Sequence, residues 1–218
     1  MSRSFTSSSV GTKVLIAVTG LLLFAFLVLH LAGNLLFFLG PETFNDYSHT
    51  LISNPLVIPM EIALLAVFLL HVYKTVAMYL GNRRARPEGY AVKEWAGHTS
   101  RTSGGSSTMI ISGLLTGLFV VIHLWQFKFG AWYTVADTEV RDLYRLMAEI
   151  FTNPVWVVVY VGFMVLLLLH LRHGFASAFQ SLGSSDNLSR RMLQAGLAVA
   201  IIIGGGFAAI PIIIYLAW

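Results

Sequence analysis

The stretch VWVVVYVGFMVLLLLH, residues 155–170, is uncharged throughout and ends on a single histidine. An α-helix needs about 20 apolar residues to cross the hydrocarbon core of a bilayer, and this stretch supplies most of them. The rest of the chain carries the same signal: 56% of its 218 residues are hydrophobic, 11% are charged and the mean hydropathy is +0.75. A soluble domain carries roughly 25% charged residues. The sequence therefore predicts an integral membrane helix bundle.

Five segments are long and apolar enough to span a bilayer as helices. They cover residues 13–39, 56–80, 108–129, 154–179 and 192–216. The predicted fold class is all-α, a polytopic membrane protein with five transmembrane helices in one domain that covers residues 1–218. The first segment is too long for a signal-peptide core and no A-x-A-like site follows it, so we expect it to be retained.

The distribution of Lys and Arg predicts the orientation through the positive-inside rule. One side of the predicted bundle carries nine of these residues and the other side three. The nine are Arg3, Lys13, Arg83, Arg84, Arg86, Lys93, Arg101, Arg190 and Arg191, and the three are Lys128, Arg141 and Arg145. We expect a multi-pass protein of a prokaryotic cytoplasmic membrane with its N-terminus in the cytoplasm and its C-terminus outside. These anchors explain the basic charge without a nucleic-acid partner.

The chain has no cysteine. This excludes disulfides, thiolate ligation of haem and any cysteine-ligated iron–sulfur cluster within the chain. If the protein carries electrons, histidines must be the ligands and any cluster must belong to a partner.

The apolar segments contain an internal repeat. TGLLLFAFLVLHL, residues 19–31, aligns without gaps on SGLLTGLFVVIHL, residues 112–124, and pairs Gly20 with Gly113. NPLVIPMEIALLAVFLLH, residues 54–71, likewise aligns on NPVWVVVYVGFMVLLLLH, residues 153–170. Leucine matches between membrane helices carry little information, whereas shared Gly-to-His and Asn-Pro-to-His spacings are rarely accidental. The repeat predicts two parallel copies of one helical hairpin, with a fifth helix added.

Each predicted hairpin contributes two intramembrane histidines. His30 and His123 lie nearer the outside, and His71 and His170 lie nearer the cytoplasm, judged from a rise of about 1.5 Å per residue. A twofold relation between the copies would make the members of each pair face each other across the bundle. Two opposed imidazoles are the axial ligands that a b-type haem needs, and such a haem carries electrons because iron keeps no open position. The macrocycle also needs small residues beside it, and candidates are Gly20, Gly33, Gly113, Gly117 and Gly174.

A single membrane histidine is equally well explained as a packed, hydrogen-bonded residue, and the other polar residues carry similar alternatives. Lys74 and His173, one turn from the inner pair, could meet haem propionates or reach lipid headgroups. Glu42, Asp46 and Glu61 lie near the outer end of the second helix and could pass protons to a quinone, or be solvated charges. His49 and His98, in predicted loops, are expected to be solvated.

The order of the four histidines resembles the cytochrome b558 membrane anchor of succinate dehydrogenases and fumarate reductases, in its single-polypeptide, five-helix, dihaem form. The resemblance extends over essentially the whole chain. It is carried further by HLAGNLLFF, residues 30–38, and by HLRHGFASAFQSLG, residues 170–183. The His-x-x-x-Gly motif of this family reads His170 to Gly174 here, which favours His170 over His173 as a ligand. The family's acidic residue two positions before that ligand is Leu168, so the proton route known in some fumarate reductases is not expected.

This resemblance implies two haems b, held by His30–His123 and by His71–His170, and a quinone substrate, often menaquinone. It also implies a flavoprotein subunit that oxidises succinate and an iron–sulfur subunit that relays electrons to this chain, which does not oxidise succinate by itself. The whole complex could be oligomeric, and lipid surrounds the membrane helices.

Two other functions stay open from the sequence. The cytochrome b subunit of a hydrogenase or formate dehydrogenase has a similar apolar character, but typically has four helices and another histidine distribution. A proton-coupled transporter would also keep buried histidines, but broken helices and inverted repeats are typical of it.

Overall fold

The chain folds into a bundle of helices in the computed structural model, which describes residues 8–85, 104–184 and 186–217. Its α-helices are α1 (Ser9–Leu35), α2 (Pro41–Ser53), α3 (Val57–Arg84), α4 (Gly104–His123), α5 (Leu143–Phe151), α6 (Pro154–Ser181), α7 (Asp186–Ala200) and α8 (Gly206–Ala217). Three short segments continue longer helices: the 3₁₀ turn η2 (Leu36–Leu39) and the π-helical segments η3 (Leu124–Lys128) and η4 (Ile201–Gly205). Within the described ranges, extended structure is limited to one isolated bridge between Thr134 and Arg141.

Five helices are long and apolar enough to cross a membrane, as predicted. They cover Ser9–Leu39, Val57–Arg84, Thr108–Lys128, Pro154–Ser181 and Arg191–Ala217. Their bounds differ from the predicted ones by only a few residues. The predicted all-α architecture with five membrane-spanning helices is confirmed. The length and apolar composition of these helices indicate a multi-pass membrane protein.

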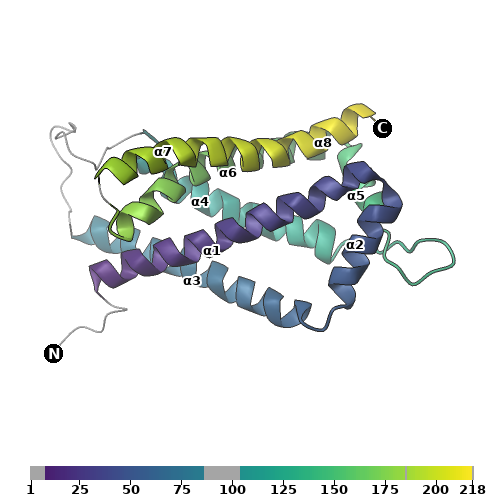
Figure 1. Ribbon diagram of the computed structural model, residues 1–218, viewed down its shortest axis with the longest axis horizontal. Coiled ribbons are helices and arrows are strands. Elements are labelled where there is room, and N and C mark those ends of the chain that lie inside the picture. Colours follow the sequence, from purple (N-terminus) through teal and green to yellow (C-terminus); the bar gives the residue numbers. More distant parts are fainter. Residues whose placement is uncertain (1–7, 86–103, 185, 218) are drawn as a thin grey trace.

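The long helices run side by side along the longest axis of the molecule (Figure 1). The start of α1 and the connection from α6 to α7 lie at one end. The opposite end carries α2, α5 and the C-terminus. The positive-inside rule predicts that the first end faces the cytoplasm and the second the outside, and we call them the inner and the outer end. Four of the predicted cytoplasmic anchors, Arg3, Arg86, Lys93 and Arg101, lie outside the described residues.

The second helix of each hairpin begins with the same Asn-Pro turn. The Oδ1 atom of Asn153 accepts a hydrogen bond of 3.0 Å from the amide of Val155, which caps α6. In the other copy, Oδ1 of Asn54 accepts a hydrogen bond of 2.9 Å from the amide of Leu56. Pro154 is the first residue of α6, where its missing N–H would have no partner, whereas Pro55 lies in the turn that leads into α3. The repeat seen in the sequence is thus also a repeat of local structure.

Four helices form a closed ring, in which α1 packs beside α3 and α6, and α4 also packs beside α3 and α6. Helix α1 therefore faces α4 across one diagonal, and α3 faces α6 across the other. The fifth span, α7–η4–α8, packs mainly on α6 and also touches α1. Its Ala200 and Ile203 join a buried cluster with Met164, Leu167 and Leu171 of α6.

The outer end is covered by two short helices that the sequence analysis did not predict. Residues 40–55 were expected to be a loop, but Pro41–Ser53 form α2. The side chain of Asn45 joins α2 to α5: its Nδ2 donates to Oδ1 of Asp142 at 2.9 Å, and its Oδ1 accepts from the amide of Tyr144 at 2.9 Å. The same Asp142 caps α5 by accepting from the amide of Arg145. Beneath this junction lies the larger buried cluster of the protein, which includes Phe37, Phe44, Met147 and Phe151.

Candidate functional site

The outer histidines face each other across the α1–α4 diagonal. The ring centroids of His30 and His123 are 5.7 Å apart and the two ring planes are perpendicular, at 90°. An imidazole nitrogen binds a transition metal at about 2 Å, so two rings that share one ion have centres about 6 Å apart. The observed spacing is close to that value. The pairing of these two histidines, predicted from the repeat, is present in the structure.

Aromatic side chains surround the outer pair. Phe26 stacks on His30, with centroids 5.2 Å apart. On the opposite side, Phe119 and Phe127 contact His123, with centroids at 5.6 and 5.0 Å. Nδ1 of His123 is buried and has no hydrogen-bond partner in the structure. Because a buried polar atom without a partner is costly, this nitrogen marks the outer pair as different from the inner one.

The inner histidines are each held by the neighbouring helix in the same way. Nδ1 of His71 lies 3.0 Å from the hydroxyl oxygen of Thr19 on α1. Nδ1 of His170 lies 3.3 Å from the hydroxyl oxygen of Ser112 on α4. Thr19 and Ser112 are equivalent in the repeat, and both are buried.

A glycine follows each of these hydroxyl residues and lets the imidazole approach the helix. A Cβ atom on Gly20 would lie 3.2 Å from Cε1 of His71, and one on Gly113 would lie 3.1 Å from Cε1 of His170. We call Thr19–Gly20 on α1 and Ser112–Gly113 on α4 the hydroxyl–glycine seats. The glycines were predicted from the repeat and the hydroxyls were not, although the Thr/Ser-Gly pair stands at the same place in both repeat copies.

The two pairs lie at different depths. The outer histidines lie about 28 to 32 Å along their helices from the first residues of α1 and α4. The inner histidines lie about 17 to 20 Å before the last residues of α3 and α6. The contacts to Thr19 and Ser112 place the inner rings 11 residues before His30 and His123 on the same helices, so the pairs are separated by roughly 16 Å along the bundle.

Each histidine pair offers two nitrogen ligands, which is enough only for a metal whose other ligands belong to a cofactor. Among the described residues, His and acidic side chains do not form any group of three or more that could hold a metal ion. A structural zinc site needs four ligands and a catalytic one usually three from the protein, so a histidine pair cannot build either alone. Haem needs only two axial ligands from the protein, because the macrocycle supplies the other four. The residues present fit this group.

The π-helical segment η3 follows His123 directly and turns two polar side chains in different directions. Gln126 points into the bundle, where its Oε1 accepts a hydrogen bond of 2.7 Å from the hydroxyl of the buried Tyr160. Lys128 points outward and forms an ion pair with Glu61 of α3. Glu61, a predicted quinone residue, is thus engaged in linking two helices.

The remaining predicted polar residues lie at the edges of the bundle. Glu42 and Asp46 are exposed on α2, in a helix where a loop was expected. His173 is half-buried, and its Nδ1 lies 3.2 Å from the carbonyl oxygen of Leu169 in the preceding turn. The ammonium of Lys74, also half-buried, lies 5.9 Å from the ring centre of Tyr73.

Two further histidines were expected in solvated loops. His49 is exposed, as expected, but on helix α2. His98 lies outside the described residues.

Three of the five glycines proposed to line the haems have other neighbours. A Cβ on Gly33 would clash with Tyr47, so this glycine serves the packing of α2 on α1. The nearest side chains to Gly117 and Gly174 are Phe68 and Met109, at 3.9 and 3.8 Å. That these three glycines lie beside a haem therefore stays a prediction.

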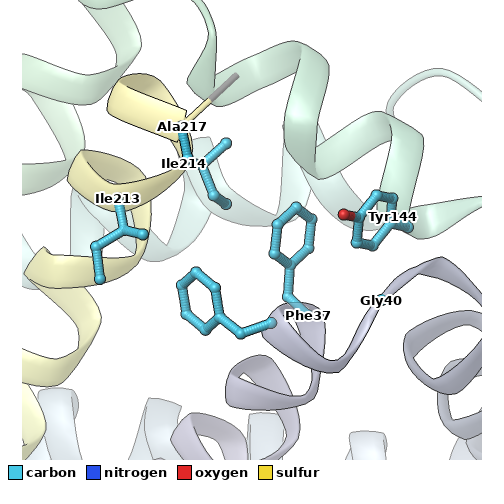
Figure 2. Close-up of a pocket in the computed structure, with 7 residues that line it drawn as sticks. Phe37, Gly40, Tyr144, Ile213, Ile214 and Ala217 are labelled. Atoms are coloured by element: carbon cyan, nitrogen blue, oxygen red, sulfur yellow. The ribbon is translucent and has the colours of Figure 1, made fainter.

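A small pocket of about 160 Å³ opens at the outer end of the bundle. Figure 2 shows its wall: Phe37 and Tyr144 on one side, Gly40 at the turn after η2, and Ile213, Ile214 and Ala217 of α8 above. The rings of Phe37 and Tyr144 stack in parallel, with centroids 4.1 Å apart and an angle of 11° between the planes. Along the helix, Phe37 lies about 10 Å beyond His30.

The loop before α5 contains a buried arginine, Arg141. The guanidinium of Arg141 lies 4.5 Å from the ring centre of Trp132 and donates to the carbonyl oxygen of Ala131 at 3.2 Å. Burial lowers the pKa of Arg141. Nearby, a hydrogen bond to the Glu149 carboxylate raises the pKa of Tyr133.

Comparison of the chain with protein-family models, with curated proteins and with solved structures yields no match.

Proposed function

We propose that the protein is a dihaem cytochrome b that anchors a respiratory dehydrogenase of the succinate:quinone oxidoreductase type in the membrane. The observation that carries this proposal is the contact between His30 and His123 across the α1–α4 diagonal, with His71 and His170 placed at another depth on the facing helices α3 and α6. A four-helix bundle builds such cofactor sites from side chains on facing helices. The family resemblance of the sequence supplies the kind of dehydrogenase.

In this proposal His30 and His123 hold the outer haem b, and His71 and His170 hold the inner one. Bound in this way, a haem supplies reversible one-electron chemistry and leaves no position for oxygen. The protein contributes orientation and exclusion of water. The seats fix the inner rings, and Phe26, Phe119 and Phe127 form a dry aromatic shell around the outer ones.

The partners follow from the same resemblance. An iron–sulfur subunit, attached to a flavoprotein that oxidises succinate, would dock at the cytoplasmic end, where the basic anchors lie. A quinone, menaquinone in the simplest case, would react near the outer pair. The pocket lined by Phe37 and Tyr144 supports this, because it opens at that end and is lined mainly by apolar side chains. Lys74 and His173 remain candidates for the propionates of the inner haem.

The proposal is tested by a pyridine haemochrome assay and a reduced-minus-oxidised visible spectrum of the purified membrane protein. We expect two haems b per chain, one of which is lost in His30→Ala and the other in His71→Ala. A chain that binds one haem or none would contradict the arrangement. Copurification from the native membrane decides the partner: a flavoprotein with succinate dehydrogenase activity supports the assignment, and a hydrogenase or formate dehydrogenase replaces it.

A further inference from the structure

The hydrogen bonds of the seats determine which nitrogen of each inner histidine carries the proton. The hydroxyl oxygen of Thr19 lies 2.7 Å from the carbonyl oxygen of Leu15 and 3.1 Å from that of Ile16, and its single hydrogen donates to these carbonyls. The same oxygen therefore accepts from Nδ1–H of His71 at 3.0 Å. Ser112 repeats the pattern: its hydroxyl donates to the carbonyl oxygen of Met109 at 3.1 Å and faces Nδ1 of His170.

The proton on Nδ1 leaves the other ring nitrogen with a free lone pair. A neutral imidazole has one donor and one acceptor nitrogen, so Nε2 becomes the acceptor in both rings. Metal-binding histidines use this division: one nitrogen binds the ion and the other donates to a second group, which fixes the tautomer and raises the basicity of the ligand.

We propose that Thr19 and Ser112 are positioning residues, which set His71 and His170 in the Nδ1-protonated tautomer and direct Nε2 of both rings to the iron of the inner haem. This inference rests on the proposed function. It assigns a role to two residues of the chain that are not ligands themselves. Gly20 and Gly113 serve the same purpose, because a larger residue at either position would push the imidazole ring away from the hydroxyl.

The outer histidines do not contact a seat, so the proposed role of Thr19 and Ser112 concerns the inner haem alone. Nδ1 of His123 has no hydrogen-bond partner in the structure. Loss of a seat hydroxyl should therefore change one haem and leave the other as it was. An acceptor on Nδ1–H makes an imidazole more electron-rich and favours the oxidised iron, so its removal should raise the potential of the inner haem.

The test is a redox titration of the two haems in the purified protein, with Ser112→Ala as the main variant because it removes a single oxygen atom. We expect two haems per chain, with the ratio of reduced to oxidised inner haem raised about tenfold at a fixed potential, a shift of about 59 mV for one electron. The outer haem should titrate as in the unaltered protein. Thr19→Ala should shift the same haem in the same direction.

Two kinds of control separate the hydroxyl from simple packing. Thr19→Ser keeps the hydroxyl and should keep the potential. Thr116→Ala removes a hydroxyl on α4 that bonds only to the carbonyl oxygen of Ser112, and it should leave both potentials unchanged.

The possible outcomes are distinct. If the unaltered protein binds no haem, the proposed function fails. If it binds two and Ser112→Ala and Thr19→Ala leave both potentials in place, the proposed function stands and the inference is overturned. If an alanine variant loses the inner haem, rescue by Thr19→Ser supports the inference, whereas loss in Thr19→Ser as well assigns Thr19 to packing and overturns it.

Discussion

Replacement of Gly113 by alanine tests the close approach of His170 to α4. The added methyl carbon would lie 3.1 Å from Cε1 of His170 and 3.6 Å from its Nδ1. Ordinary van der Waals contact between carbon atoms begins at about 3.5 Å, so the ring must retreat by a few tenths of an ångström. That movement lengthens the contact between Nδ1 and the Ser112 hydroxyl, which is already 3.3 Å.

The expected magnitude follows from two opposing effects. Overpacking of a buried site typically costs about 1–3 kcal/mol. Alanine is better than glycine in a helix interior by about 0.8–1.0 kcal/mol, which offsets part of that cost. The net loss for Gly113→Ala is thus about 0–2 kcal/mol, to which displacement of a cofactor ligand adds. Gly20→Ala, with its methyl 3.2 Å from Cε1 of His71, should behave in the same way.

Gly162→Ala is the matched control. Gly162 lies inside α6, and a Cβ there meets nothing within 4 Å, so only the gain of about 0.8–1.0 kcal/mol applies. The two variants should therefore differ by about 1–3 kcal/mol, which in a protein of this size separates their thermal midpoints by about 2–12 °C. Haem content and thermal unfolding, followed in one detergent, provide the comparison. The reasoning is refuted if Gly113→Ala is as stable as Gly162→Ala and its haem spectrum is unchanged.

Three other changes have defined outcomes. His170→Ala should remove the inner haem while His173→Ala keeps both, since only His170 contacts a seat. The haem content of the two variants decides this, and the reverse result would shift the repeat alignment of α6 by one turn. Asn45→Ala removes the buried side chain that joins α2 to the start of α5, and should lower the free energy of unfolding by about 1–3 kcal/mol in a denaturation measurement; an unchanged value would show that the two outer helices do not depend on it. Glu149→Gln should return the pKa of Tyr133 toward its ordinary value, because the carboxylate that raises it is gone; ultraviolet titration of the phenol measures this, and a titration at unchanged pH would contradict the contact.

The membrane helices and the histidine pairing could be predicted because both depend on signals that are local in the sequence. Apolar length marks a span directly, and a repeat carries the position of His30 onto His123 without knowledge of the packing. The seats could be predicted only in part. Gly20 and Gly113 were found from the repeat, but their neighbours depend on which face of the helix each glycine occupies. Gly33, which packs against Tyr47 of α2, is a case that the sequence alone does not resolve.

The outer helices α2 and α5 were missed for a different reason. They are short and amphipathic, and each is stabilised by contact with the other rather than by its own propensity. Asn45 and Asp142 are far apart in the chain, so no local pattern indicates their hydrogen bond. The ion pair between Lys128 and Glu61 also joins residues that are far apart in the chain. It depends on a π-helical turn that no pattern in the sequence predicts.

Helix α3 has no buried residue along its whole length, although it carries His71. Its partner across the diagonal, α6, is covered by the fifth span, whereas among the described residues α3 packs beside α1 and α4 and touches α2 near its start. Acyl chains or a neighbouring subunit are therefore expected to cover the exposed residues of α3. Extraction into a harsh detergent should then disturb the position of His71 on α3 more than that of His170 on α6. The protein should therefore be purified in native lipid discs. A preparation stripped of lipid should lose the contact of His71 first, and would be mistaken for a protein that binds a single cofactor.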